Sequence, residues 1–413
     1  MTSGRLARRL GLGDAVVIGL GAMIGAGIFA SFGPATAAAG SGLLVALAVA
    51  ALVAYCNATS SARLAARYPE SGGTYVYGRE RLGRFWGYLA GWSFVIGKTA
   101  SCAAMALTVG EYVWPARAHL IAVLAVLALT AVNYVGVHKA AWLTRAIVAV
   151  VLAVLVVVVA VSVGSGVGAG GRLVPHTTAL GVLQAAGLLF FAFAGYARIA
   201  TLGEEVRDPE RTIPLAIPIA LGITFVAYAV VAVAVLAVLG PVRLAASSAP
   251  LADAVRAAGL PGLVPVVTVG AAVAALGSLL ALILGVSRTT LAMARDRHLP
   301  GTLAAVHPRF EVPHHAEFAV GVVVAVVAAT ADVRAAIGFS SFGVLLYYSV
   351  ANASAWTLDR AWRQRILPAA GLAGCLVLAF SLPVSAVLSG LVVVAVGIMA
   401  YLVRRQFPPP PPP

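Results

Sequence analysis

The stretch GLGAMIGAGIF, residues 19–29, places four glycines near the centre of an apolar run that is long enough to cross a membrane. Glycine weakens a helix interior, so this density of glycines predicts that the helix is interrupted there. A second stretch, FFAFAGYARIAT at residues 190–201, is interrupted near its centre by Gly195 and then by the charge of Arg198. The two stretches begin corresponding groups of five apolar runs. Together they predict two membrane helices that are each broken in the middle.

The composition is that of a membrane protein with many spans. Of 413 residues, 61% are hydrophobic and 10% are charged, against about 25% charged residues in an average soluble domain. A spanning helix needs about 20 apolar residues, whereas barrel strands would be about 10 residues long with alternating polarity. We therefore predict an all-α polytopic membrane protein with twelve transmembrane helices, near residues 15–38, 41–62, 84–112, 118–136, 142–164, 180–202, 213–239, 262–292, 317–332, 335–356, 366–381 and 383–403.

The basic residues predict the orientation of these spans. Most of the 28 lysines and arginines fall in the loops on one side, together with both termini. The other side holds only Arg117, Arg172, Arg243, Arg256 and Arg334. Such a bias predicts a protein of the cytoplasmic membrane with both termini in the cytoplasm. The net charge of +14 is then a topology signal with anionic membrane lipid as a secondary contact, and no nucleic acid partner is expected.

The spans suggest a division of the chain into five parts. We expect a cytoplasmic N-terminal segment at 1–14, a first inverted repeat at 15–164, a second at 180–356, two further spans at 366–403 and a proline-rich cytoplasmic tail at 404–413. The N-terminus superficially resembles a signal peptide, but its apolar run is long, interrupted by glycine and followed at once by another span. The sequence does not indicate an oligomeric state.

The glycines of span 1 allow two other interpretations. Gly21 and Gly25 also fit the small-xxx-small pattern of close helix packing, which stays open for that pair alone. A nucleotide-binding loop is disfavoured because no strand precedes the glycines. Two broken helices in corresponding positions are instead the sequence signature of an inverted-repeat transporter. Unwound segments expose backbone N–H and C=O groups, and a zwitterionic amino acid would satisfy both kinds.

In these segments the chain resembles the amino acid-polyamine-organocation (APC) permease family, which has the five-plus-five inverted-repeat fold of the leucine transporter. The resemblance covers nearly the whole chain. The segments that carry it are GLGAMIGAGIF, RYPESGGTYVYGRERLG at 67–83, GW at 91–92, FFAFAGYARIATLGEEVRDPERTIPLAI at 190–217 and SRTTLAMARDRHLP at 287–300. It implies a secondary transporter of amino acids or related amines, coupled to protons, with helices 1 and 6 discontinuous.

The resemblance also implies a binding site made mostly of main chain. Backbone N–H groups of Ala26, Gly27 and Ile28 would hold the substrate carboxylate. Phe191 matches the aromatic residue that closes over the substrate. The carbonyls that would take the amino group belong to Met23, Phe191 and Ala194.

The loop after span 6 would contribute to the inner gate. In the family, acidic residues here close the gate against basic residues, and Glu204 is the residue expected to do so. Arg198 is interpreted as a charge of this gate or of the helix end in preference to a substrate ligand. The simpler alternative for the charges of this loop is a cluster exposed to water.

Lys98, in VIGKTASC at 95–102, is the charge that the apolar runs do not explain. An ionised lysine at mid-membrane costs about 3 to more than 10 kcal/mol, so it needs a partner, a water-filled cavity or the loss of its charge. Many proton-coupled members of the family carry a lysine in span 5, but here that position falls near Val151, and the acid often found in span 6 is replaced by Ala197. Three roles for Lys98 stay open: it carries the coupling proton, it selects an acidic or polar substrate side chain, or it donates to carbonyls of the unwound helices.

Other functional classes find less support. Cys56, Cys102 and Cys375 lie inside spans without metal-ligand spacing, and we expect no metal and no cofactor. An enzyme is not expected, because a membrane hydrolase would rest on a Lys98–Ser101 dyad alone. An amino acid exchanger without proton coupling and a non-transporting sensor of the same fold are the remaining alternatives.

Overall fold

The computed structural model describes residues 10–68, 72–135, 141–166, 177–200, 206–310 and 312–406. These residues are nearly all helical, and within them the only β-type pairing is an isolated bridge between Leu10 and Val206. The predicted class, an all-helical protein with many membrane spans, is confirmed. Glu204 lies outside the described residues.

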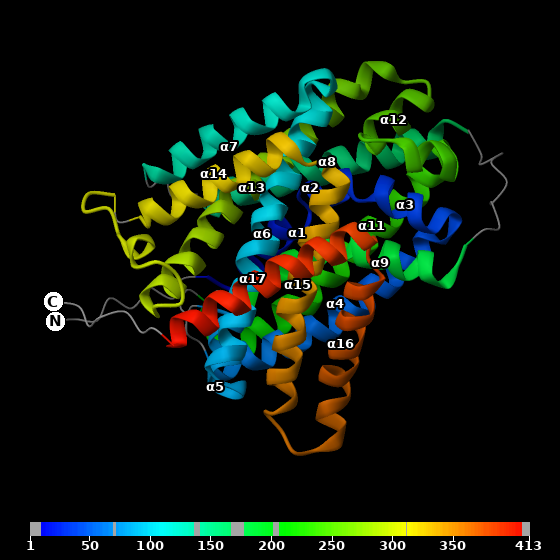
Figure 1. Ribbon diagram of the computed structural model, residues 1–413. Helices are drawn as coiled ribbons and strands as arrows, with labels where there is room; N and C mark the ends of the chain where they lie inside the picture. Colours follow the sequence, from blue (N-terminus) through cyan, green and yellow to red (C-terminus); the bar gives the residue numbers. More distant parts are fainter. Residues whose placement is uncertain are drawn as a thin grey trace.

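The helices agree with the predicted spans to within a few residues, apart from the end of span 2, where the helix runs on to Arg67, and the end of span 7, where α11 continues past a kink at Gly240 (φ 67°). They are α1 (Leu12–Met23), α2 (Ala26–Ala30) and α3 (Phe32–Ala39) for span 1, then α4 (Leu43–Arg67), α6 (Arg84–Val113), α7 (Ala118–Tyr134), α8 (Ala141–Gly164), α9 (Ala179–Phe193) with α10 (Ala197–Ala200), α11 (Pro209–Ala246), α13 (Val264–Arg295), α14 (His314–Thr330), α15 (Val333–Trp356), α16 (Trp362–Ser381) and α17 (Val384–Gln406). Two shorter helices, α5 (Thr74–Leu82) and α12 (Pro250–Ala257), lie between spans (Figure 1).

Eleven helical stretches of the described chain are long and apolar enough to cross a membrane. The 17-residue α14, at the place of the ninth predicted span, falls short of that length. At 1.5 Å per residue it is roughly 25 Å long, slightly less than a hydrocarbon core of about 30 Å. The count of twelve spans therefore stays a prediction.

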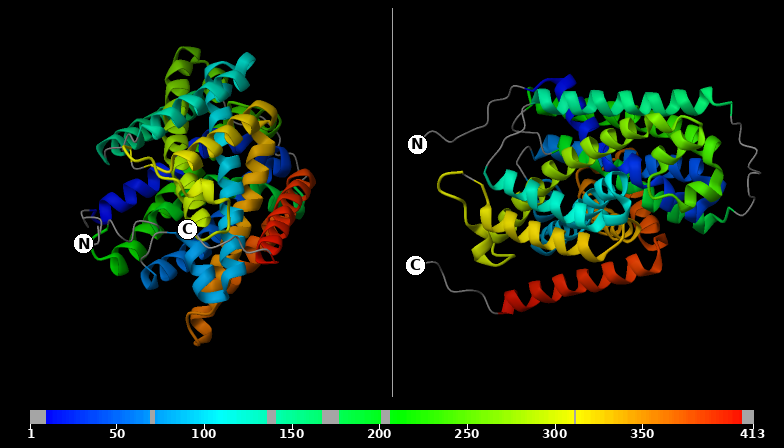
Figure 2. Two further views of the ribbon diagram at one scale, coloured as in Figure 1. Left: turned by 60° about the vertical axis from the view of Figure 1, so that its left-hand side comes forward. Right: turned by 90° about the horizontal axis from the view of Figure 1, so that it is seen from above.

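The two halves of the chain pack in the same pattern. The second helices of the two halves, α4 and α11, pack on each other. Each also packs on the broken helix of the opposite half: α4 on α9, and α11 on α1. The third helix of each half contacts the last helix of the other: α6 packs on α15, and α13 on α8. The short helices α5 and α12 precede these third helices at matching points. Figure 2 shows α8 and α17 at opposite edges of the resulting bundle.

Helices α6 and α15 approach each other most closely at Gly97 and Gly343. A Cβ atom added at Gly97 would lie 3.0 Å from the backbone nitrogen of Val344 and 3.2 Å from the Cα of Gly343. One turn further on, the hydroxyls of Ser101 and Ser340 share a 2.6 Å hydrogen bond. The two backbones are therefore in direct contact, and no larger residue fits between them without a shift.

Hydrogen bonds divide the loops into the two sides expected from the charge pattern. On the basic side, Arg63 pairs with Asp359, and Arg79 pairs with Asp296 at 2.8 Å. Tyr75 donates to the same Asp296 carboxylate at 2.5 Å. Burial and this carboxylate raise the pKa of Tyr75, so its hydroxyl remains a donor. These contacts join the loops after spans 2, 8 and 10 on one side of the bundle.

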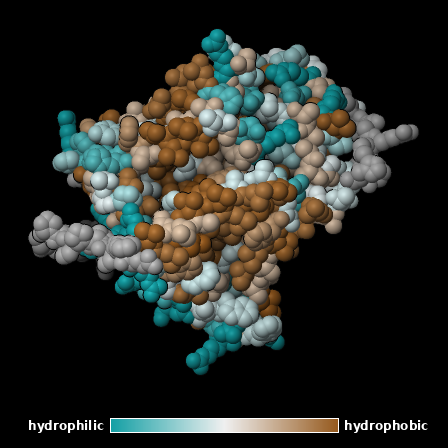
Figure 3. Space-filling model, in the orientation of Figure 1, coloured by the Kyte–Doolittle hydropathy of each residue, from teal (hydrophilic) through white to brown (hydrophobic). Residues whose placement is uncertain are grey.

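The opposite side and the outer faces also fit a membrane protein. On that side Arg334 donates to the carbonyl of Ala245 at 2.6 Å, which joins the loops after spans 7 and 9. Large apolar side chains stay exposed on the outer helices, for example Val156 at 66% and Val392 at 62%. Figure 3 shows an apolar surface that includes α17. Exposed apolar area of this extent is expected where lipid surrounds the protein.

Candidate functional site

Span 1 is broken at Ile24 and Gly25. Helix α1 ends at Met23, Ile24 and Gly25 leave the helical conformation with ψ of 57° and −141°, and α2 starts at Ala26. A Cβ atom on Gly25 would collide with the side chain of Ser278, which accounts for the need for glycine. The first N–H groups of a helix have no partner within it, and those of Ala26, Gly27 and Ile28 are the first of α2. Their role as ligands of a substrate carboxylate stays a prediction.

Span 6 is broken opposite to it. Helix α9 ends at Phe193, a 3₁₀ turn runs through Ala194–Tyr196, and α10 follows. The two broken segments touch through their glycines. A Cβ atom on Gly27 would lie 2.6 Å from the Cα of Ala192, and one on Gly195 would overlap the backbone oxygen of Ala22. The predicted discontinuity of both helices is confirmed.

Three side chains from neighbouring helices donate to carbonyls at the breaks. Tyr228 of α11 donates to Met23 O at 2.6 Å and to Ala192 O at 3.1 Å. Lys98 of α6 donates from its Nζ to Ala194 O at 3.3 Å, and Tyr348 of α15 donates to the same oxygen at 3.4 Å. Two of the carbonyls expected to take a substrate amine, those of Met23 and Ala194, thus already accept protein donors.

The structure brings most of the predicted site residues together. The expected substrate ligands of α1, α2 and the span 6 segment are buried, and the side chain of Phe191 is 8% exposed. Lys98 is 8% exposed and reaches this group through Ala194 O. Arg198 is exposed and lies in the last turn of α10. The predicted partner of the gate, Glu204, is outside the described residues.

Lys98 has no acidic partner within ion-pair distance in the described part of the chain. Its recorded hydrogen-bond acceptor is a backbone oxygen at a helix break. Ser101 bonds Ser340 and the carbonyl of Gly97 at 3.2 Å, and no hydrogen bond to Lys98 is recorded for it. The geometry therefore gives no support to a serine–lysine dyad. Val151 is fully buried in the apolar core, so span 5 offers no ionisable group at that position.

Tyr228 and Tyr348 are the site residues that the sequence prediction missed. Each carries a hydroxyl into a membrane span, and such a group needs a partner at membrane depth. A tyrosine within a membrane span thus indicates a hydrogen bond, but the sequence does not indicate which carbonyl accepts it. Asp14 of α1 and Arg145 of α8 form another unpredicted contact, an ion pair on the basic side of the bundle.

The Tyr228→Phe variant should be less stable than the wild type. The ring can keep its packing against Phe193, at 5.2 Å between ring centres, while Met23 O and Ala192 O each lose a donor. Met23 O keeps its hydrogen bond from the backbone N–H of Gly25, so the variant loses one hydroxyl donor that the two carbonyls share. A lost hydrogen bond costs about 0.5–1.5 kcal/mol, so we expect a lower unfolding midpoint in detergent. Tyr55→Phe is the control, because Tyr55 is 44% exposed and its hydroxyl makes no recorded bond in the described structure. Equal midpoints for the two variants would contradict the assignment of Tyr228.

Comparison with known proteins identifies the class to which this fold and site belong. The family model described as amino acid permease matches residues 10–409, nearly the whole chain. The chain therefore belongs to the amino acid permease family, and the family indicates a membrane transporter of amino acids or amines.

Similarity to individual proteins extends over comparable lengths. The chain is 72% identical over 404 residues to an uncharacterized transporter of Mycobacterium tuberculosis (strain ATCC 25618 / H37Rv), covering 97% of this chain and 92% of the relative. It is 26% identical to a methylthioribose transporter of Bacillus subtilis, covering 97% and 94%. It is also 26% identical to a branched-chain amino acid permease of the same organism, covering 78% and 74%.

Proposed function

We propose that this chain is a secondary active transporter that moves amino acids or related amines across the cytoplasmic membrane by alternating access, coupled to protons. The observation that carries the proposal is the pair of opposed helix breaks, where N–H groups of α2 and carbonyls of spans 1 and 6 come together. Two such breaks at corresponding points are expected of transporters with inverted repeats. They are not expected of a channel, because two half-helix gates imply alternation.

The matched packing of the two halves supports the repeats at 15–164 and 180–356. The contact of α4 with α9 corresponds to that of α11 with α1. The contact of α6 with α15 corresponds to that of α13 with α8. Such a fold can present its site to either side by moving one group of helices against the other. Both termini and the basic loops are then cytoplasmic, as the distribution of arginine favours.

The substrate pose follows from the chemistry of the breaks. The carboxylate binds the N–H groups at Ala26, Gly27 and Ile28, where the helix dipole is positive. The amino group binds the carbonyls on the other side of the break, and Phe191 covers it. Ala194 O already accepts two hydrogen bonds, so the amine must displace Lys98 or Tyr348 to reach it.

We assign to Lys98 the coupling of a proton to this exchange. Its ammonium joins unbroken α6 to the broken span 6, and a charge-assisted hydrogen bond contributes about 1.5–3 kcal/mol. Loss of the proton removes the charge and weakens this connection. A proton can shift the conformational equilibrium only through such a difference in contacts between two states.

The inner gate combines residues of spans 1, 5 and 6. The Asp14–Arg145 pair closes α1 against α8, and Arg198 lies at the end of α10, before the segment that contains Glu204. We assign Arg198 and Glu204 to the same gate. Opening toward the cytoplasm then requires separation of the Asp14–Arg145 pair.

The substrate is to be found by a thermal-shift screen of the purified protein with the twenty amino acids, simple amines and polyamines. A ligand at about 100 times its dissociation constant stabilises by about 2.7 kcal/mol, so a true substrate should raise the unfolding midpoint. The ligands found are then tested in proteoliposomes for uptake and counterflow. Uptake driven by a pH gradient supports proton coupling, whereas counterflow without a response to the gradient supports an exchanger. Binding without either supports a sensor, and no shift with any compound contradicts the amino acid assignment.

A further inference from the structure

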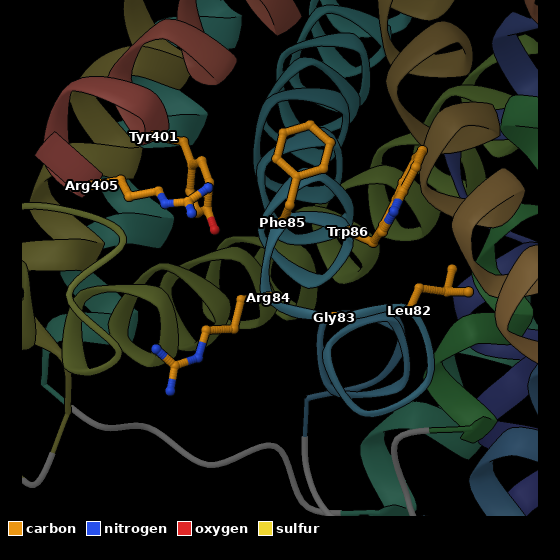
Figure 4. A pocket seen from close by; sticks show the side chains of 7 residues that line it. All are labelled: Leu82, Gly83, Arg84, Phe85, Trp86, Tyr401 and Arg405. Atoms are coloured by element: carbon orange, nitrogen blue, oxygen red, sulfur yellow. The ribbon is translucent and has the colours of Figure 1, made fainter.

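A surface pocket lies on the basic side of the bundle, where α5 ends, α6 begins and α17 ends (Figure 4). Its volume is about 460 Å³. The residues that line it are Leu82, Gly83, Arg84, Phe85, Trp86, Tyr401 and Arg405. The lining thus combines two guanidinium groups with three aromatic rings and contains no acidic residue.

The two arginines of the pocket are not neutralised within the described chain. Neither Arg84 nor Arg405 has a recorded hydrogen bond or ion pair, and both are exposed. Two acids on the same side of the bundle, Glu80 and Asp296, are engaged elsewhere, since both pair with Arg79. The pocket therefore presents uncompensated positive charge.

The backbone adds to this charge. Helix α6 starts at Arg84 after Gly83, whose φ is 104°, and it has no side-chain cap. The first backbone hydrogen bond of this helix runs from the N–H of Gly87 to the carbonyl of Gly83. The N–H groups of the residues between them therefore have no partner within the helix. These N–H groups and the guanidinium groups are both suited to the oxygens of a phosphate.

The aromatic lining and the apolar surface of α17 favour a lipid headgroup over a free anion as the ligand of this pocket. Phe85 and Tyr401 form a wall with their ring centres 5.6 Å apart, and Figure 4 shows Arg405 and Tyr401 together on α17, with Arg84 and Phe85 on α6. Beyond the pocket, α17 exposes Leu388, Val396 and Met399 to the membrane. Acyl chains can lie along this apolar surface of α17 (Figure 3) while the headgroup reaches the pocket.

We propose that this pocket binds the phosphate headgroup of an anionic phospholipid, with Arg84 and Arg405 as its ligands and the acyl chains along α17. The inference goes beyond transport and does not depend on the substrate. A site of this kind would make the stability of the inner end of α17 depend on the lipid composition of the membrane.

The test uses the purified full chain in a neutral detergent. Short-chain phosphatidylglycerol, phosphatidylcholine with the same chains, and inorganic phosphate are titrated while the unfolding midpoint is measured. The variant Arg84→Gln/Arg405→Gln is compared with Arg360→Gln/Arg363→Gln, which removes two exposed arginines just before and in the first turn of α16 on the same side. Both pairs are on the surface, and both remove the same charge.

We expect phosphatidylglycerol to raise the wild-type midpoint at about tenfold lower concentration than phosphatidylcholine. Both lipids offer a phosphate to the two arginines, but the choline group of phosphatidylcholine carries a positive charge that the arginines repel, whereas phosphatidylglycerol has a net negative charge. The pocket variant should lose this preference, and the Arg360/Arg363 variant should keep it. Equal effects of the two lipids, or equal losses in the two variants, would overturn the proposal. An equal stabilisation by inorganic phosphate at millimolar concentration would assign the pocket to a free anion and would also overturn the lipid assignment.

Discussion

Uptake by the Lys98→Met variant in proteoliposomes is expected to lose its response to a pH gradient. Methionine fills a similar volume but can neither carry a proton nor donate to Ala194 O. If the proton on Lys98 contributes about 1.5–3 kcal/mol to one conformation, its loss changes the gradient-driven rate about tenfold or more. The measurement is the initial rate of labelled substrate uptake with and without an inward proton gradient.

The variant Lys98→Arg separates the roles of charge and titration. Arginine can still donate to a carbonyl but does not release its proton in proteins. A coupling role predicts that arginine fails like methionine, whereas a purely structural donor predicts that arginine preserves the response. A role in choosing the substrate side chain predicts a changed set of substrates and an unchanged response in the methionine variant. Ser101→Ala, one turn away on α6, is the control and should respond like the wild type.

The second large effect is expected for Gly195→Ala, at the 3₁₀ turn of span 6. The new methyl group would overlap the carbonyl of Ala22, and a backbone oxygen cannot rotate away as a flexible side chain can. Overpacking of this kind costs about 1–3 kcal/mol and forces apart the two broken segments. We expect a lower unfolding midpoint and loss of substrate binding, measured by thermal shift with the substrate found in the screen.

The control for this experiment is Gly222→Ala in the exposed part of α11. No atom outside the helix lies within 4 Å of the position of its Cβ, so alanine should be neutral or should stabilise the helix by up to about 1 kcal/mol. Wild-type stability and binding in Gly195→Ala would show that the two breaks do not need to be in contact. A loss in Gly222→Ala as large as in Gly195→Ala would point instead to a general intolerance of the spans.

The sequence predicted the spans well because length and apolar composition determine a membrane helix almost by themselves. It also located both breaks, since a cluster of glycines and a charge at mid-span both disfavour a continuous apolar helix. The hydrogen bonds of Tyr228 and Tyr348 could not be predicted, because they join residues far apart in the chain, such as Tyr228 and Met23. Periodicity reports the faces of one helix and carries no information on which carbonyl of another helix lies opposite.

Lys98 shows the same division between what the sequence reveals and what it leaves open. Its charge in an apolar run was visible, and so was the need for a partner. The partner is a carbonyl that is exposed only because span 6 unwinds at Ala194, so it follows from the fold and not from a nearby acid. The roles assigned to Arg198 and Glu204 stay predictions.

The backbones of α6 and α15 are in direct contact at Gly97 and Gly343, and these two helices carry Lys98 and Tyr348. Both side chains hold the same oxygen, Ala194 O. If span 6 moves away from α6 and α15, both hydrogen bonds to Ala194 O are broken, and the tight packing of the two helices favours their loss in one step. The two hydrogen bonds to Ala194 O are then lost in one cooperative step. The uptake rate should therefore follow a single transition as the proton concentration changes, and not a series of partial transitions.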